Sequence, residues 1–155
     1  MSYLRFDDGG LPRFGRLEAG VVTPLDDAPW AGGEPAGTPR PYEGLDLLPP
    51  VPPGGKVLCI GRNYLAHAKE LGNEVPSEPL VFLKPSTSLL AHGGTVLLPP
   101  ESERVDFEGE LALVIGRRAR RVSREEFDDV VFGVTPAFDI SARDLQKKDG
   151  QWWRA

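Results

Sequence analysis

One stretch decides the fold and the chemistry, residues 105–116, which reads Val-Asp-Phe-Glu-Gly-Glu-Leu-Ala-Leu-Val-Ile-Gly. Its apolar second half is typical of a β-strand. Side chains two residues apart on a strand point to the same face, so Glu108 and Glu110 are predicted to share one. Neighbouring carboxylates repel each other, and a divalent cation is the simplest group that would offset the repulsion. Spacing alone leaves an alternative open, a sheet edge that is acidic and faces solvent.

A second acidic segment follows at residues 138–146, Phe-Asp-Ile-Ser-Ala-Arg-Asp-Leu-Gln. Asp139 lies at the end of another predicted strand. Three carboxylates from two strands would form an all-oxygen site, which suits a hard ion such as Mg²⁺ or Mn²⁺. The two segments together therefore suggest a metal site.

Composition limits the class of protein. The 155 residues are enough for one domain with a core, and 40% hydrophobic with 26% charged residues is ordinary for a globular protein. The net charge of −5 argues against a nucleic-acid partner, and the basic run at 117–121 is interpreted as a solvated turn. No apolar run approaches the roughly 18 residues that span a membrane. Without a signal peptide, a cytoplasmic location is the default expectation.

The order of elements predicts an α+β, mainly β, protein in two parts. Residues 1–53 are expected to form a small N-terminal β-rich domain, with a meander over 1–25 and a Pro-rich linker. Residues 54–155 are expected to form the N-terminal part of a catalytic domain. Its predicted strands cover 56–60, 80–84, 95–98, 107–116 and 132–140. Helical segments are expected at 64–71, from an N-cap at Ser123 to about Val130, and at 141–147.

A second group of residues has the chemistry of an acid–base site. His67 and Glu70 lie three apart in the predicted helix, so they share a face and could form a general base that activates water. A chance pair on a surface helix is the alternative. Lys84 is either a strand-edge residue or a cationic contact for an anionic substrate. Arg143 could bind the same anion through two parallel hydrogen bonds, or pair with Asp144 on the surface.

Four segments in this order resemble the fumarylacetoacetate hydrolase family, at residues 60–70, 82–87, 107–111 and 139–146. The resemblance is to acylpyruvate hydrolases and 2-hydroxyhepta-2,4-diene-1,7-dioate isomerases. It implies the family's mixed β-roll, usually as a homodimer. Family members continue well beyond Ala155, so the roll is expected to be incomplete at the C-terminus.

The resemblance also implies roles for particular residues. The metal, Mg²⁺ with Mn²⁺ or Ca²⁺ as substitutes, would be held by Glu108, Glu110 and Asp139. The catalytic residues would be His67, Glu70 and Lys84. The substrate-binding residues would be Arg62, Tyr64, Lys84, Ser86, Arg143 and Gln146.

The implied activity is cleavage of a C–C bond in an acylpyruvate-like 2,4-dioxo acid. Water activated by His67 would attack the distal carbonyl, and the metal would stabilise the enolate that leaves. The same enolate would serve an isomerase or a decarboxylase of a related 2-oxo or 2-hydroxy-dienoic dicarboxylate. Two further alternatives are a truncated, non-catalytic remnant that binds a metal or a partner protein, and a β-rich interaction module without metal.

Overall fold

The computed structural model describes residues 1–61, 63–64 and 76–155. Contacts divide the chain into two compact units. The first unit comprises Met1–Pro52, Leu90–Thr95 and Gly109–Asp139. The second comprises Pro53–Leu89, Val96–Glu108 and Ile140–Ala155. Strands predominate and the helices are short, which confirms the predicted α+β, mainly β, fold class.

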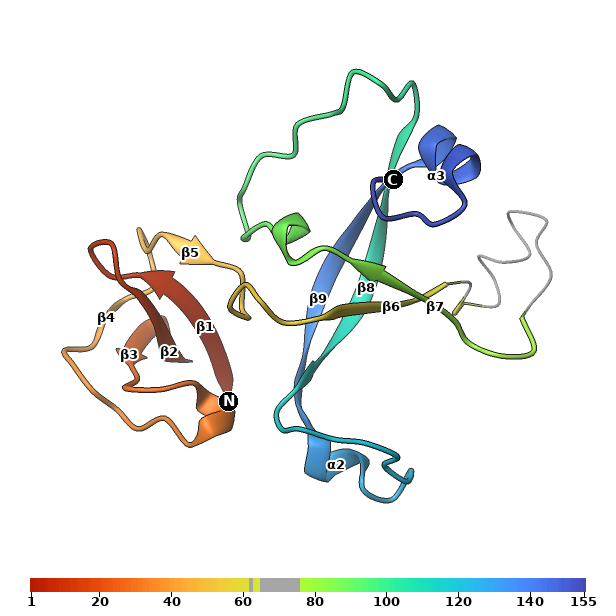
Figure 1. The fold of residues 1–155 in the computed structure, drawn as a ribbon. Helices are drawn as coiled ribbons and strands as arrows, with labels where there is room; N and C mark the ends of the chain where they lie inside the picture. The colour runs from red at the N-terminus through yellow and green to blue at the C-terminus, as the bar shows by residue number, and fades with distance from the viewer. Residues whose placement is uncertain (62, 65–75) are drawn as a thin grey trace. The chain divides into compact units, whose positions relative to one another are not determined.

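The N-terminal residues form a five-stranded antiparallel sheet with the strand order β4-β3-β2-β1-β5 (Figure 1). Two positive φ angles, 47° at Ala19 and 76° at Gly20, allow the two-residue turn between the second and third strands. The predicted meander over residues 1–25 is therefore confirmed. The strands are β1 (Ser2–Asp7), β2 (Pro12–Glu18), β3 (Val21–Pro24), β4 (Arg40–Pro41) and β5 (Leu47–Leu48).

This sheet has a closely packed core. Phe6 and Val22 are fully buried, and Leu25 is 4% exposed. Position 15 favours glycine, because a Cβ there would lie 2.5 Å from the Cγ1 atom of Val22, which would have to shift. The alternation of the three long strands thus places apolar side chains together on a covered face.

Aromatic rings join the N-terminal sheet to a later strand of the same unit. Trp30 belongs to the 3₁₀ helix η1 (Pro29–Ala31). The centre of its ring lies 5.1 Å from that of Phe14 and 5.7 Å from that of Phe132. The Phe132 ring also contacts the ring of Tyr3, with 5.4 Å between the two ring centres. Phe132 belongs to β9 (Val131–Ala142), so the N-terminal segment packs on its own chain.

Two shorter sheets follow. The strands β6 (Val57–Gly61) and β7 (Leu80–Lys84) pair antiparallel, with Leu58 opposite Leu83 and Ile60 opposite Val81. All four of these side chains are between 45% and 61% exposed. A 3₁₀ helix, η2 (Ser86–Ser88), follows β7 closely.

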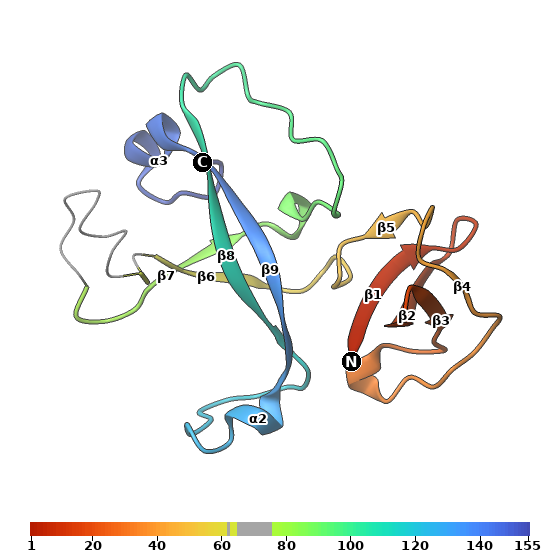
Figure 2. The same ribbon diagram turned by 180° about the vertical axis from the view of Figure 1, so that it is seen from behind.

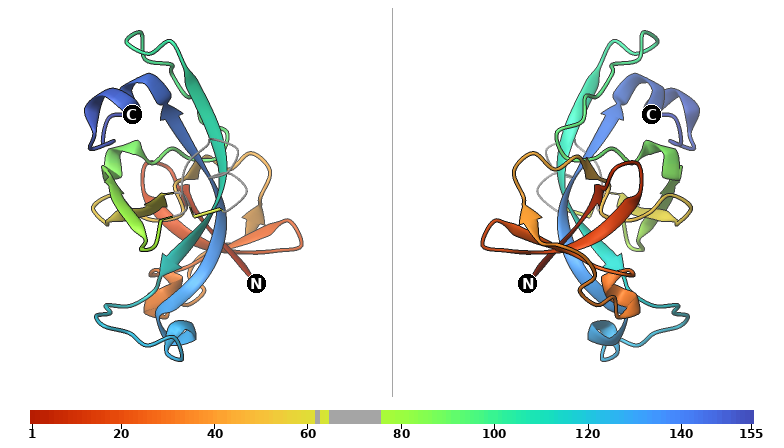
Figure 3. Two further views of the ribbon diagram at one scale, coloured as in Figure 1. Left: turned by 90° about the vertical axis from the view of Figure 1, so that its right-hand side faces the viewer. Right: turned by 90° about the vertical axis from the view of Figure 1, so that its left-hand side faces the viewer.

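The strand β8 (Val105–Ile115) pairs with β9, and the two run side by side in Figures 1 and 2. The backbone N–H of Gly116 donates to the carbonyl of Val130 at 2.8 Å, and that of Arg143 donates to Arg104 at 2.9 Å. Each bond joins the end of one strand to the start of the other, so the pair is antiparallel. The helix α3 (Arg143–Asp149) follows β9 directly, as Figure 3 shows.

Three predicted elements differ from the structure or lie outside it. Residues 95–98 form no strand; Leu97 is 85% exposed, and none of the described strands pairs with this segment. The helix α2 (Phe127–Val130) begins later than predicted, with Glu126 as its N-cap. The Ser123 N–H donates to the Glu126 carboxylate at 2.9 Å, so that carboxylate closes the preceding turn instead. The predicted helix at 64–71 lies, from residue 65 onward, outside the described residues.

None of the helices in the described part of the chain has the length and apolar character needed to cross a membrane.

Candidate functional site

The acidic strand alternates as its spacing predicts. Glu108 and Glu110 are both half-buried, whereas the intervening Gly109 and the flanking Phe107 are exposed, Phe107 by 77%. Asp106 also lies on the half-buried side of β8. This side of the strand therefore carries three carboxylates in succession.

Arg143 lies against this acidic side. Its side chain is only 13% exposed, and its Nε donates to Asp106 Oδ2 at 2.9 Å. One terminal nitrogen donates to Glu108 Oε1 at 2.5 Å, and the other donates to Gln146 Oε1 at 3.2 Å. One guanidinium thus holds two carboxylates of β8 and a side chain of α3.

Charge pairing shifts the pKa values of this group. Hydrogen bonds from Arg104, and then from Arg143, lower the pKa of the Asp106 carboxyl. Burial alone would lower the pKa of the Arg143 guanidinium, but its hydrogen bonds to Glu108 and Asp106 outweigh burial and raise it. Both shifts favour the ionised forms of Asp106 and Arg143.

Asp144 fixes the start of α3 to the loop before β8. Its carboxylate accepts from the Ser102 hydroxyl at 2.5 Å and from the Glu103 backbone N–H at 2.9 Å. These bonds lower the pKa of the Asp144 carboxyl. The alternative in which Arg143 pairs with Asp144 is not what the structure records, because Arg143 bonds to Asp106, Glu108 and Gln146.

Lys84 ends β7, and its Nζ lies 5.9 Å from the centre of the Phe82 ring. The same ring meets Trp152 edge-on, with a distance of 5.3 Å between ring centres. Ser86, two residues beyond Lys84, is half-buried at the start of η2. Lys84 and Ser86 are thus brought to one end of the β6–β7 hairpin.

Other predicted site residues are less well placed. Tyr64 is 45% exposed and belongs to no regular element. Arg62, His67 and Glu70 lie outside the described residues. One residue of this network that sequence reasoning missed is Asp106. Asp106 could have been found by extending the two-residue spacing of Glu108 and Glu110 one step towards the N-terminus.

The predicted metal ligands fit a hard cation in kind. Carboxylate oxygens are the donors such ions prefer, and the spacing on β8 points two of them to one side. Asp139 is half-buried on β9. However, within residues 1–61, 63–64 and 76–155 no three His, Cys, Asp or Glu side chains gather closely enough to hold a metal ion. The ligand roles of Glu108, Glu110 and Asp139 therefore stay a prediction.

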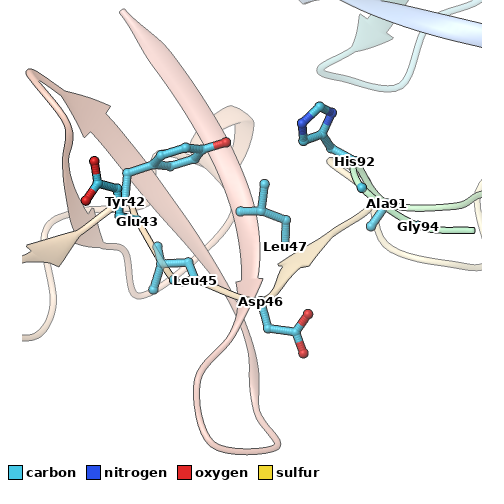
Figure 4. Close-up of a pocket in the computed structure, with 10 residues that line it drawn as sticks. Tyr42, Glu43, Leu45, Asp46, Leu47, Ala91, His92 and Gly94 are labelled. Carbon is cyan, nitrogen blue, oxygen red and sulfur yellow. The ribbon is translucent and has the colours of Figure 1, made fainter.

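A surface pocket of about 420 Å³ lies elsewhere, within the first unit. It is lined by residues 42–47 and 91–94, and Figure 4 shows Tyr42 and Leu47 on one side with His92 on the other. None of the predicted site residues lines it.

The family model described as Fumarylacetoacetate (FAA) hydrolase C-terminal matches residues 56–155, more than half of the chain. The chain belongs to the fumarylacetoacetate hydrolase family. A second model, Rv2993c-like, N-terminal, matches residues 1–50 of this family member. A solved structure of 5-carboxymethyl-2-hydroxymuconate delta-isomerase from Mycobacterium smegmatis has the same fold, with a TM-score of 0.85 and 32% identity. The match covers 100% of this chain and 61% of that one.

Curated relatives of this fumarylacetoacetate hydrolase family member include named enzymes. Oxaloacetate tautomerase FAHD1, mitochondrial, of Arabidopsis thaliana is 50% identical over 103 residues, which cover 64% of this chain and 46% of the relative. Protein Rv2993c of Mycobacterium tuberculosis is 40% identical over 140 residues, covering 89% and 52%. The chain thus spans about half the length of the curated relatives it matches.

Proposed function

We propose that this chain forms part of a divalent-metal-dependent enzyme that stabilises the enolate of a small 2-oxo acid and thereby cleaves a C–C bond of an acylpyruvate-like 2,4-dioxo acid. The observation that carries the proposal is the row of half-buried carboxylates on β8 beside a guanidinium that is 13% exposed. Membership of a family with enzymes among its relatives supports it.

The residues of this chain would divide the work as follows. Glu108, Glu110 and Asp139 would hold the cation, whose positive charge would act as a Lewis acid on the oxygens of the substrate. Arg143 and Lys84 would bind the anionic oxygens of the substrate through charge-assisted hydrogen bonds. Both side chains are only partly exposed, so little water would compete for these bonds.

Bond cleavage needs a water molecule as well as a stabilised enolate. His67, with its tautomer fixed by Glu70, would remove a proton from that water, which attacks the distal carbonyl. The electrons of the broken bond would remain on the 2-oxo acid fragment as its enolate. Proton transfer to the enolate carbon then completes the reaction.

Keto–enol or double-bond isomerisation is the second candidate. The printed names of two relatives, an oxaloacetate tautomerase and a delta-isomerase, favour it. It would use the same enolate but no attacking water. The two candidates therefore differ in the role of His67: hydrolysis needs it to remove a proton from water, and isomerisation does not.

The test measures both reactions on the chain with Mg²⁺ present, using an acylpyruvate for hydrolysis and enol-oxaloacetate for tautomerisation. His67→Ala should abolish hydrolysis, a loss of about 100-fold or more for a general base. His92→Ala is the matched control, because His92 is exposed and lines the pocket that none of the predicted site residues lines. Tautomerisation without any hydrolysis would favour the second candidate.

Metal dependence is tested by calorimetric titration with Mg²⁺ and Mn²⁺, with oxalate as an enolate mimic. Glu108→Gln should weaken binding of the metal, and unchanged affinity would contradict its role as a ligand. Metal binding without turnover would favour a non-catalytic remnant. The predicted homodimer is tested on the same samples by sedimentation velocity.

A further inference from the structure

We infer that Asp106 is a positioning residue, which sets the orientation of the Arg143 guanidinium and, through it, of the Glu108 carboxylate. The inference rests on the proposed function only in taking Glu108 as part of the site. The contacts that support it all lie within the second unit.

The geometry of arginine makes one of its hydrogen bonds constrain the others. A guanidinium is planar and presents its N–H donors in a rigid fork. When Asp106 accepts from Nε at 2.9 Å, the direction of both terminal nitrogens is fixed. One then reaches Glu108 at 2.5 Å, and the other reaches Gln146 at 3.2 Å. Without the bond to Asp106, the fork could rotate about its long side chain.

The backbone brings these groups together. Asp106 and Glu108 are two residues apart on β8, so a single guanidinium can reach both. The Arg143 N–H donates to the Arg104 carbonyl at 2.9 Å, which fixes the root of the arginine side chain beside the start of β8. The side chain therefore begins at a fixed point and is directed by Asp106.

The two arginine partners of Asp106 differ in exposure. The Arg104 side chain is 63% exposed and that of Arg143 is 13% exposed. If Asp106 is removed, water can readily take over its hydrogen bonds with the exposed Arg104. Water reaches the largely buried Arg143 less easily. Removal of Asp106 should therefore act mainly on Arg143, which would turn its freed donors towards Glu108 and compete there with a cation.

The first measurement needs no metal. In a ¹⁵N–¹H spectrum, an arginine Nε–H that is shielded and hydrogen-bonded exchanges slowly with water, and Arg143→Met identifies the Arg143 signal by its loss. We expect Asp106→Ala, which removes the acceptor, to make this signal exchange as fast as that of an exposed arginine. Asp128→Ala, the same change at an exposed position of α2, should leave it unchanged. An unaltered Arg143 signal in a folded Asp106→Ala variant overturns the inference.

The second measurement is a double-mutant cycle on Mn²⁺ affinity. Asp106→Ala should weaken Mn²⁺ binding about tenfold, as expected when a group that orients a ligand is lost. In the Arg143→Met background, the same change should alter affinity by less than about twofold, because the two residues act as one unit. Additive effects would mean that Asp106 acts through its charge alone, and would overturn the inference.

The two measurements separate this inference from the proposed function. If the wild-type chain binds no Mn²⁺, the proposed metal site is wrong for this chain, and the Arg143 signal still decides whether Asp106 orients the guanidinium. If Mn²⁺ binds and the cycle is additive, the metal site stands and the positioning role fails.

Discussion

The N-terminal sheet and the β6–β7 hairpin are built from the same kind of alternating strand, but large apolar side chains are buried in the sheet and exposed in the hairpin. In the sheet, the apolar side chains of Phe6, Val22 and Leu25 are at most 4% exposed. In the hairpin, the cross-strand pair of Leu58 and Leu83 is more than half exposed. Alternation therefore determines which side chains share a face, but not whether that face is covered.

The same contrast explains why the acidic residues of β8 are informative. On this strand the half-buried side carries Asp106, Glu108 and Glu110, while four apolar residues on the other side are exposed, Phe107, Leu111, Leu113 and Ile115. Burying carboxylates is costly unless they are paired. The three acids share the half-buried side of β8 with Ala112 and Val114, so they need charge partners such as Arg143, and a functional site is the reason we propose for their position.

The largest effect should come from truncating matched leucines in the two regions. Leu25→Ala should lower the free energy of unfolding by about 2–5 kcal/mol, because it leaves a cavity in a filled core. Leu83→Ala, at a side chain that is 55% exposed, should change it by no more than about 0.5 kcal/mol. Urea denaturation measures both. Equal losses would show that the hairpin face is covered in solution, and the two regions would then not differ in burial.

A smaller effect is expected from adding one methyl group to two strand glycines. Gly15→Ala should destabilise the sheet by about 1–3 kcal/mol, since its new Cβ would lie 2.5 Å from Val22 Cγ1. Gly133→Ala on β9 is the control, because nothing lies within 4 Å of the added Cβ. If Gly15→Ala proves as harmless as its control, the core of the sheet is more loosely packed than the structure indicates.

Local patterns in the sequence predicted most strands and the acidic side of β8, because a two-residue period is read within one segment. The N-terminal meander and the strand containing Glu108 are examples. Residues 95–98 look equally strand-like, but a strand also needs a neighbour to pair with, which no local pattern supplies. The Arg143–Asp106 contact was missed for a related reason: its partners are 37 residues apart and meet only when β8 pairs with β9.

The smallest effect is expected from the hydrogen bonds of Asp144, which join the start of α3 to the loop before β8. The Ser102 hydroxyl and then the Glu103 N–H lower the pKa of the Asp144 carboxyl in the folded state. The ionised carboxylate therefore contributes stability above the unfolded pKa of about 3.9, and this contribution is lost as the pH falls through the lower, folded pKa. Asp144→Asn removes it, so the variant should be slightly less stable at neutral pH and lose less stability on acidification.

The measurement is the urea midpoint of wild type, Asp144→Asn and the exposed control Asp128→Asn, followed from pH 7 down through the range in which aspartate titrates, about pH 5 to 2. The wild type and the control should weaken in parallel as the pH falls, while Asp144→Asn follows a shallower course. A shared pH dependence for all three would mean that the Asp144 bonds to Ser102 and Glu103 contribute nothing to folding. The start of α3 would then be held by the backbone pairing of β8 and β9 and by the side-chain hydrogen bonds of Arg143.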